Sequence, residues 1–209
     1  MRERATGFLA EGERKHATIL FADVAGSLEL ADGRDPEEVG ALLDPAIGRM
    51  MEAVHRYHGI VNQVLGDGIM AIFDAPGAAR DHALAACLAA LRMQDRIAGL
   101  GPASAAAPPV RIRVGLNSGE VLIRTIANGA DGDCSAVGRA THLAARMQQM
   151  ARPGSTLVGG ETARLVQGRL QFEPMGPLRV KGLTEPVEVY ELVRLGAPPS
   201  EASVPAGRR

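Results

Sequence analysis

Apolar residues recur at every third or fourth position in two long stretches of the chain, residues 36–54 and 80–98. This spacing places them on one face of a helix, so it predicts two amphipathic helices. Asp35 and Pro36 suit the N-cap and first position of the first helix, and Gly59 follows its end. A third, shorter helix is predicted near residues 137–150, after a glycine-rich loop at 128–133.

Short apolar runs outside these stretches predict strands. The first run, residues 18–23, ends in Asp23 and is typical of a buried central strand. Two further pairs of runs flank the glycine-containing turns Gly66–Gly68 and Asn117–Gly119. Toward the C-terminus we expect a short strand, a short helix and a final strand. These strands are residues 60–64, 69–73, 110–116, 120–126, 156–158 and 187–192, and the short helix is 161–166.

The predicted order, β-α-β-β-α-β, is that of a ferredoxin-like α+β domain, here with an αβ extension at its C-terminal end. We expect the domain to cover residues 16–195, between a polar tail at 1–15 and a Pro/Ala/Ser-rich tail or linker at 196–209. Many unrelated functions use this architecture, so the fold class alone does not identify one.

Composition excludes several classes of function. The 209 residues include 23 Lys and Arg against 24 Asp and Glu, so there is no overall basic field to bind nucleic acid. No apolar stretch approaches the roughly 20 residues that a membrane span needs. The chain has only two cysteines, which fits a reducing cytoplasm. These features predict a cytoplasmic enzyme or binding module.

Two acidic residues lie where a metal site is conceivable. Asp23 ends the first predicted strand and Asp67 lies in the turn between the next two, and these points can be adjacent in a β-α-β-β sheet. Two convergent carboxylates can hold Mg²⁺ against a phosphate, because this ion prefers oxygen ligands. From the pair alone, a strand terminator and a tight turn are the simpler interpretation.

Several short segments occur together in a recognisable order: Phe21–Gly26, Leu65–Met70, Arg111–Gly119, Ala136–Met147, Arg179–Leu183 and Val187–Tyr190. In order and spacing they resemble the catalytic domain of the class III nucleotidyl (adenylate/guanylate) cyclases. The resemblance covers about residues 16–194, nearly everything but the tails. The set as a whole is far more specific than any one of its motifs.

The resemblance implies a reaction in which the ribose 3′-hydroxyl of a nucleoside triphosphate attacks the α-phosphorus and pyrophosphate leaves. It implies two ions per site, Mg²⁺ or Mn²⁺, one activating the attacking oxygen and one steadying the leaving phosphates. Asp23 and Asp67 match the family's metal ligands. Val24, Ala25 and Gly26 match the stretch whose free backbone amides meet the β- and γ-phosphates.

Three cationic side chains match positions that contact phosphate in the family. Arg146 matches the arginine that stabilises charge building on the α-phosphoryl group, and Arg113 and Lys181 match residues that grip the pyrophosphate end. Taken singly, such side chains are usually solvated, and Arg146 near a helix end could simply favour the helix dipole. The full set of motifs favours the functional interpretation.

Other positions depart from the family's usual pattern. Where the family has a Lys and an Asp that read adenine, this chain has Gln63 and Ser135, with Asp133 two residues earlier. A Gln amide both donates and accepts, so it can address either purine. His142 replaces an Asn oriented toward the ribose. Either the imidazole takes over one hydrogen bond of that amide, or His142 is a packing substitution in a weakened enzyme.

In the family, one subunit supplies the metal carboxylates and its partner supplies the base-reading and transition-state residues. The chain contains both halves, so a homodimer with two equivalent sites is expected, with the dimer arm at residues 128–133. We expect an adenylate cyclase that converts ATP to 3′,5′-cyclic AMP, within a protein that carries further domains. The alternatives are a cyclase that prefers GTP or a pyrimidine nucleotide, and a degenerate nucleotide-binding regulatory domain.

Overall fold

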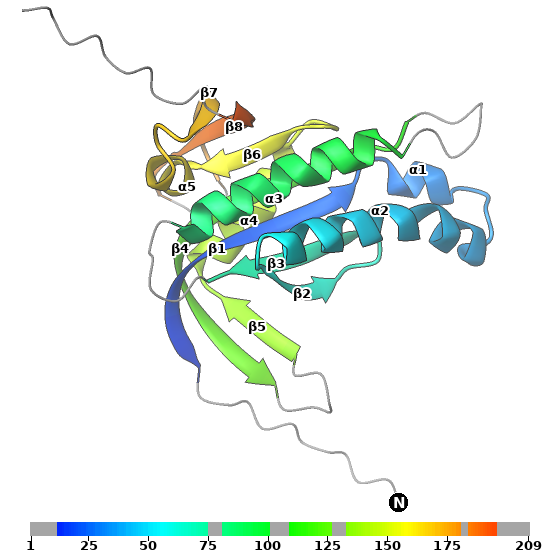
Figure 1. The fold of residues 1–209 in the computed structure, drawn as a ribbon, viewed down its shortest axis with the longest axis horizontal. Helices are drawn as coiled ribbons and strands as arrows, with labels where there is room; N and C mark the ends of the chain where they lie inside the picture. Colours follow the sequence, from blue (N-terminus) through cyan, green and yellow to red (C-terminus); the bar gives the residue numbers. More distant parts are fainter. Residues whose placement is uncertain (1–11, 75–80, 101–108, 127–132, 181–183, 196–209) are drawn as a thin grey trace, which may run out of the picture.

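Strand β1 (Glu13–Val24) runs through the middle of a mixed sheet in the computed structural model of the chain (Figure 1). The structure describes residues 12–74, 81–100, 109–126, 133–180 and 184–195. The other strands are β2 (Ile60–Val64), β3 (Gly68–Phe73), β4 (Ile112–Ile126), β5 (Asp133–Val137), β6 (Thr156–Gly159), β7 (Leu170–Leu178) and β8 (Val187–Leu195). The helices are α1 (Ser27–Ala31), α2 (Pro36–Arg56), α3 (Asp81–Ala98), α4 (Arg139–Met150) and α5 (Gly160–Leu165).

The strand order within the described sheet is β2-β3-β1-β4-β6-β8-β7, with β5 paired to residues 122–126 of β4. β1 is antiparallel to both β3 and β4, whereas β4 and β6 are parallel. This order confirms the predicted ferredoxin-like α+β class, and α5, β7 and β8 form the C-terminal extension. It also places the end of β1 between β3 and β4, where side chains from three strands can meet.

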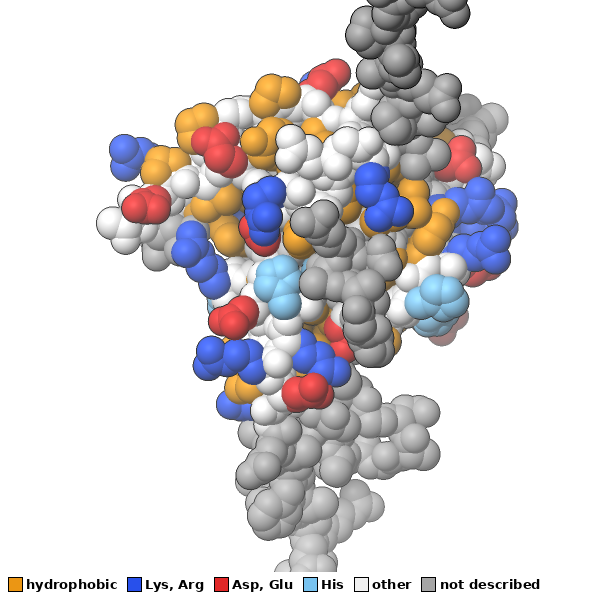
Figure 2. Space-filling view, turned by 60° about the vertical axis from the view of Figure 1, so that its left-hand side comes forward, with side chains coloured by type: hydrophobic (Ala, Val, Ile, Leu, Met, Phe, Trp, Pro, Cys, Tyr) orange, Lys and Arg blue, Asp and Glu red, His pale blue; other side chains and the backbone are white. Residues whose placement is uncertain are grey.

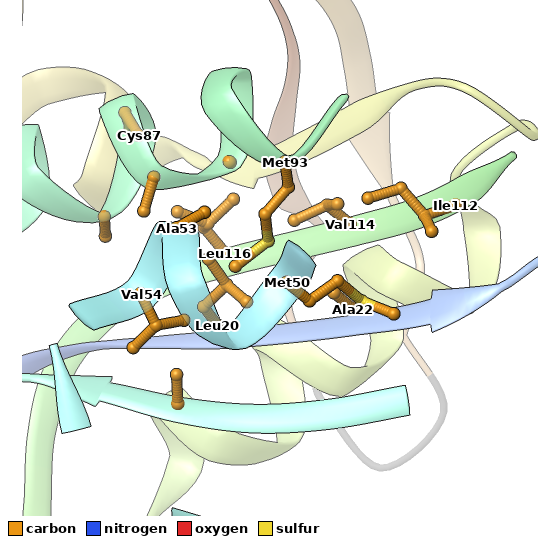
Figure 3. Close-up of a cluster of buried hydrophobic side chains, with 14 of the residues drawn as sticks. Leu20, Ala22, Met50, Ala53, Val54, Cys87, Met93, Ile112, Val114 and Leu116 are labelled. Atoms are coloured by element: carbon orange, nitrogen blue, oxygen red, sulfur yellow. The ribbon is translucent and has the colours of Figure 1, made fainter. Parts of the chain in front are cut away.

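Successive side chains of β1 point to opposite faces of the sheet, as in any strand. Leu20 packs beneath α2 and α3 in the main core, beside Met93 (Figure 3). Ile19 packs on the opposite face with Ala144 of α4. Because the alternation continues along the strand, Asp23 lies on the α4 face.

Helix α4 lies directly on β4 at Gly115. A Cβ atom at this position would lie 2.7 Å from Cα of Gln148 and closer still to the Ala144 carbonyl oxygen, so no side chain fits. Gly115 is opposite Phe21 in the β1–β4 register, two positions from Arg113. The absence of a side chain at Gly115 therefore sets the depth of α4 over the sheet near the end of β1.

Helix α2 begins as its sequence predicts. Pro36 is its first residue, and Oδ1 of Asp35 accepts a hydrogen bond of 2.9 Å from the N–H of Glu37. This cap satisfies a donor that the first helical turn leaves unpaired. The glycine expected to end the helix, Gly59, packs against Phe73, where a Cβ atom would lie 2.6 Å from Cζ of the ring.

Strand β4 corrects one prediction. Asn117–Gly119 was expected to form a turn between two short strands, but β4 is one continuous strand of 15 residues. It stays paired with β1 throughout this segment, with Ser118 opposite Thr18. The polar residues that indicated a turn are buried inside the fold instead.

A buried polar cluster, here called the Thr18 network, explains this difference. Thr18 Oγ1 lies 2.7 Å from Ser118 Oγ and 2.7 Å from Nδ1 of His82, and Ser118 Oγ lies 2.9 Å from Thr162 Oγ1. All four side chains are at most 2% exposed. Buried polar groups need hydrogen-bond partners, and these residues from β1, β4, α3 and α5 supply them to one another.

Some elements were not predicted. Helix α1 follows β1 directly, and β5 lies between the expected glycine-rich loop and α4. β7 contains Pro174, Gly176 and Pro177, which obscure a strand in the sequence. Proline is tolerated there because β7 is at the edge of the sheet, and its register shifts between Pro174 and Gly176. β1 also begins at Glu13, before the expected domain start at residue 16.

None of the described helices combines the length and the hydrophobicity that a membrane crossing requires. Acidic and basic side chains are interspersed over the face shown in Figure 2 rather than separated into fields of one sign. With a formal net charge of −1, the chain must build any electrostatic site from local groups.

Candidate active site

The end of β1 and the β2–β3 turn bring two carboxylates together. Asp23 is opposite Gly68 in the β1–β3 register, and Asp67 directly precedes Gly68. The N–H of Val24 donates to the Asp67 carbonyl at 2.9 Å, which fastens the turn to the strand. Gly68 is required because a Cβ atom would lie 2.9 Å from Cβ of Asp23, and Gly66 makes the turn with a φ of 77°. Asp67 is therefore held beside Asp23.

Arg113 forms a two-point ion pair with Asp23. The two residues are opposite one another in the β1–β4 register. Nε of Arg113 donates to Oδ1 at 3.2 Å and Nη2 donates to Oδ2 at 3.1 Å, a bidentate geometry. The Asp23 and Arg113 side chains are 25% and 32% exposed, so solvent reaches the pair.

Burial raises the pKa of the Asp23 carboxyl above its ordinary value, and the nearby charge of Asp67 adds to the increase. Arg113 opposes this shift through its hydrogen bonds and charge, and Gln148 of α4 opposes it more weakly. The net shift of the Asp23 pKa is upward. The surrounding groups therefore do not fully compensate the Asp23 charge, and an added cation would.

The backbone after the first carboxylate is hydrogen-bonded within the protein. The N–H groups of Val24 and Ala25 donate to the carbonyls of Asp67 and Arg111, at 2.9 and 2.8 Å. Both groups are therefore engaged in this structure, and their contact with phosphate stays a prediction. Gly26, which turns the chain into α1 with a left-handed φ of 77°, remains a candidate.

Two carboxylates, rather than a closed cage, form the candidate metal site. Within the described ranges, no group of three or more His, Cys, Asp or Glu side chains is placed to hold an ion. Mg²⁺ is commonly bound by one or two carboxylates together with substrate phosphates and water, and Asp23 and Asp67 fit this mode. Arg113 donates one hydrogen bond to each oxygen of Asp23, and each oxygen keeps a further lone pair that an ion could use.

His142 and Arg146 lie one turn apart on the outer side of α4, away from its buried side. His142 is exposed and Arg146 is half-buried. Nη1 of Arg146 donates to Oε1 of Gln149 at 2.8 Å. In the part of the chain that the structure describes, Arg146 forms no ion pair with either carboxylate.

The other predicted residues lie elsewhere in the chain. Gln63 is exposed on β2, at the edge of the sheet. Ser135 is half-buried in β5, and Asp133 is the first residue of that strand. Lys181 and residues 128–132 of the expected dimer arm lie outside the described residues. The contacts in the structure thus join the two carboxylates and Arg113 but do not join them to the base-reading candidates.

Sequence reasoning missed two residues that contact the carboxylates. Ser27 donates its hydroxyl to Oδ2 of Asp67, and Gln148 lies against Asp23. Ser27 had a signal, because a serine after a glycine is typical of a helix start. No local signal marks Gln148. Its position beside Asp23 depends on how α4 packs over the sheet, and the sequence spacing does not specify that packing.

A family model described as the adenylate and guanylate cyclase catalytic domain matches residues 9–194. Two solved structures are similar in both fold and sequence. The adenylyl cyclase CyaB from P. aeruginosa has a TM-score of 0.80 at 27% identity, covering 88% of this chain and 96% of that one. The guanylyl cyclase Cya2 has a TM-score of 0.80 at 26% identity, covering 90% of this chain and 97% of that one.

Curated relatives are longer than the matched region. Adenylate cyclase 1 of Rhizobium meliloti is 28% identical over 184 residues, which are 86% of this chain and 28% of the relative. An uncharacterised protein of Mycobacterium tuberculosis is 28% identical over 194 residues, which are 90% of this chain and 34% of the relative. The chain therefore spans about a third of the length of the curated relatives it matches.

Proposed function

Since the chain belongs to the adenylate and guanylate cyclase catalytic domain family, we propose that it is an adenylate cyclase that works as a homodimer and converts ATP to 3′,5′-cyclic AMP and pyrophosphate. The convergence of Asp23 and Asp67, with Arg113 bound to Asp23, is the observation that carries this proposal. These residues offer carboxylates for metal ions and a guanidinium for phosphate at one end of the sheet.

The chain's cations would act on charge that develops during the reaction. A bond forms between O3′ of the ribose and the α-phosphorus, the bond to pyrophosphate breaks, and the hydroxyl proton leaves. Negative charge therefore builds on the α-phosphoryl group and on the leaving phosphates. Arg146 would stabilise the first, and Arg113 and Lys181 the second, because donors aimed at developing charge lower the barrier. His142 would hydrogen-bond the ribose.

Asp23 and Asp67 would hold Mg²⁺ or Mn²⁺, two ions per site, which when bound supply positive charge to the attacking and leaving oxygens. The N–H of Gly26 would contact the phosphates. Arg113 would have two successive partners, Asp23 in the free protein and the pyrophosphate end of the substrate in the complex. A guanidinium fork suits both, because carboxylate and phosphate each accept two parallel hydrogen bonds.

Two subunits would complete each site. Arg146 and His142 lie on the outer side of α4 and form no contact with the carboxylates of their own chain, which supports a role toward a partner. Apolar side chains on and near β2 and β5 are 49% to 54% exposed, which supports their burial between subunits: Ile60, Val64, Leu65 and Val137. A two-fold axis would make both sites equivalent.

A cyclase with another base preference is the second candidate, and Gln63 and Ser135 favour it. An amide at Gln63 can pair with the edge of adenine or of guanine, because it both donates and accepts. The two similar structures do not decide the base, since one is named an adenylyl cyclase and the other a guanylyl cyclase. GTP or a pyrimidine nucleotide is therefore the alternative substrate.

A regulatory domain that binds nucleotide without turnover is the third candidate. Against it, the chain has Asp23, Asp67 and Arg146 together, and binding alone does not require a transition-state arginine. The length of the curated relatives supports further domains in the whole protein. The nucleotide substrate and the two-cysteine composition support a cytoplasmic location.

Incubation of the purified protein with ATP, GTP, CTP or UTP in the presence of Mn²⁺ tests the proposal. We expect cyclic AMP from ATP as the main product, measured by chromatography. Asp23→Asn is the control variant, because it removes the carboxylate charge with little change of shape and should abolish product. Product from another nucleotide alone would change the base assignment, and no product from any of them would favour the regulatory domain.

A further inference from the structure

Two histidines that are 66 positions apart in the sequence meet near the start of β1, away from Asp23. His16 lies on β1 and His82 on α3, and Nδ1 of His16 is 3.4 Å from Nε2 of His82. The ring planes are tilted by 52° and their centroids are 5.4 Å apart, so the rings do not stack and the two nitrogens lie between them. His82 is buried, whereas the side chain of His16 is 39% exposed, so solvent reaches the pair from one side.

The other ring nitrogen of each histidine faces an oxygen atom. Nε2 of His16 lies 3.8 Å from Oε1 of Glu161, and Nδ1 of His82 lies 2.7 Å from Oγ1 of Thr18. The hydrogen bonds from Arg164 hold the pKa of the Glu161 carboxyl below its ordinary value, so this group is ionised. A carboxylate attracts a proton and cannot donate one. Glu161 therefore favours the tautomer of His16 with its proton on Nε2.

The Thr18 network allows the matching tautomer of His82. The hydroxyl proton of Thr18 can go to Ser118 at 2.7 Å, and that of Ser118 can go to Thr162 at 2.9 Å. Thr18 then accepts a hydrogen bond from the Nδ1–H of His82. In these tautomers, Nδ1 of His16 and Nε2 of His82 present lone pairs to each other. Two lone pairs at this distance repel one another unless a cation lies between them.

The distance between the two nitrogens is that of two ligands on one metal ion. Zn²⁺ binds imidazole nitrogens at about 2.0–2.1 Å with tetrahedral geometry, which places two such nitrogens roughly 3.3–3.4 Å apart. The observed 3.4 Å agrees with this value and is long for a hydrogen bond. Histidines that bind zinc usually donate their other N–H to an oxygen such as a carboxylate. Glu161 and Thr18 are placed to accept these two bonds.

We propose that Nδ1 of His16 and Nε2 of His82 bind a Zn²⁺ ion, which fastens β1 to α3. Imidazole suits zinc, whereas the Mg²⁺ or Mn²⁺ of the proposed function prefers oxygen ligands. Among the described residues, no third His, Cys, Asp or Glu is placed to join the pair, so water on the exposed side of His16 would complete the coordination. This site does not depend on the proposed function, because it lies at the other end of β1 from Asp23.

Long-range ¹H–¹⁵N spectra of the histidine rings in the whole protein test the proposal, because they report the tautomer of each ring and the nitrogen that binds an ion. Added Zn²⁺ should shift Nδ1 of His16 and Nε2 of His82, and the same concentration of Mg²⁺ should shift neither. The titration also gives the Zn²⁺ affinity of this site, separately from any binding at Asp23 and Asp67. Zn²⁺ should raise the thermal stability of the wild type, because it binds the folded state.

His16→Phe keeps a planar ring and removes both nitrogens. We expect Zn²⁺ to bind His82 in this variant at least tenfold more weakly, because losing even an outer partner of a zinc ligand typically costs about 10–100-fold. The thermal stabilisation by Zn²⁺ should fall with it. Glu161→Gln removes only the charge behind His16 and should weaken binding less. His55→Phe is the matched control, since His55 is exposed in the last turn of α2 and should not affect the site.

Three results would overturn the site. If Zn²⁺ binds without shifting the nitrogens of His16 and His82, the ion lies elsewhere on the protein. If His16→Phe keeps the wild-type Zn²⁺ affinity and stabilisation, the pair is not the ligand set. If Zn²⁺ does not bind and the two rings respond only to pH, the facing nitrogens share a proton instead of a metal ion. None of these results would affect the proposed function, which depends on Asp23, Asp67 and Arg113.

Discussion

Strands β1 and β4 carry two polar clusters that differ in how completely they are hydrogen-bonded. In the Thr18 network, hydroxyl and imidazole groups from four elements are almost fully buried and bond to one another. Farther along the same strands, Asp23 and Arg113 are partly exposed, and burial and the charge of Asp67 raise the pKa of Asp23. The Thr18 network is called the closed cluster below, because its groups bond to one another. Asp23, Asp67 and Arg113 are called the open cluster, because solvent and ligands can reach them.

This difference separates polar residues that hold the fold from those available for a ligand. A fully satisfied buried network rigidifies the core, whereas partly exposed charges with shifted pKa values gather at functional sites. Sequence alone did not distinguish the two clusters, because Asn117–Gly119 and Gly66–Gly68 both indicated turns. Only the second is a turn, and it carries the carboxylate.

The largest effect is expected from Arg146→Ala. Removing a donor aimed at developing charge typically lowers turnover by about 10²–10³-fold. The Arg146 side chain is half-buried and donates to the exposed Gln149 of its own helix, so the fold should be little affected. Product formation and thermal unfolding measure the two effects. Arg139→Ala, at the exposed start of α4, is the control and should stay active. Near-normal turnover of Arg146→Ala would contradict the assigned role.

Mixing two inactive variants tests whether the open cluster is completed by a partner. Asp23→Asn and Arg146→Ala damage opposite halves of the site, so each mixed dimer would have one intact site. Random exchange should restore about one quarter of the wild-type activity, because half of the dimers are mixed and each has one of its two sites intact. Activity is measured after co-refolding. A mixture as inactive as its components would refute the shared site.

Thr18→Val, a substitution in the closed cluster, should lower the stability of the fold without lowering turnover. It removes the hydroxyl that joins Ser118 and His82 while keeping the shape of the side chain. We expect the free energy of unfolding to fall by about 1–3 kcal/mol, measured by urea denaturation, with unchanged turnover per folded molecule. Lost turnover at full stability would instead make the Thr18 network part of the active site.

His142→Ala should have a smaller effect on turnover. Loss of one hydrogen bond to a charged or polarised group costs about tenfold in rate. His142→Asn should recover the rate, because its amide can make the same hydrogen bond. Turnover of both variants is measured beside the wild type. Unchanged turnover in His142→Ala would identify His142 as a packing substitution.

The smallest effect is expected at Cys87, a residue of α3 whose side chain is buried in the core. Burial raises the pKa of its thiol to about 12, and the thiolate is the reactive form. The folded protein should therefore resist alkylation by iodoacetamide at pH 8, whereas the urea-unfolded chain should react, as followed by mass spectrometry of the Cys87 peptide. Rapid alkylation of the folded protein would show that α3 opens locally.

Elements with a clear local pattern were predicted within a few residues. The apolar spacing and the Asp35–Pro36 cap determine α2, and the same spacing determines α3. The continuity of β4 could not be predicted, because Ser118 is satisfied by Thr18 and Thr162, which are distant in sequence. Long-range partners decide such segments, and a local pattern does not contain them.

The candidate site was predictable only in its residue types. The motifs indicated Asp23, Asp67 and Arg113, and their roles remain predictions. The ion pair between Arg113 and Asp23 depends on the β1–β4 register, which the motifs do not specify. The hydrogen bonds of the backbone amides after Asp23 could not be predicted for the same reason, because their acceptors are carbonyls of a turn and of the residue before β4.

The close contact at Gly115 bears on communication between active sites. Because Gly115 has no side chain, α4 packs directly on β4. Strand β4 carries Arg113, and helix α4 carries Arg146. In the proposed dimer, each of these arginines serves a different catalytic centre. A shift of one that follows nucleotide binding would displace the other, so occupancy of one centre would alter the affinity of its twin. Cooperativity between the two active sites would then be transmitted within a single subunit, by the contact between α4 and β4 at Gly115.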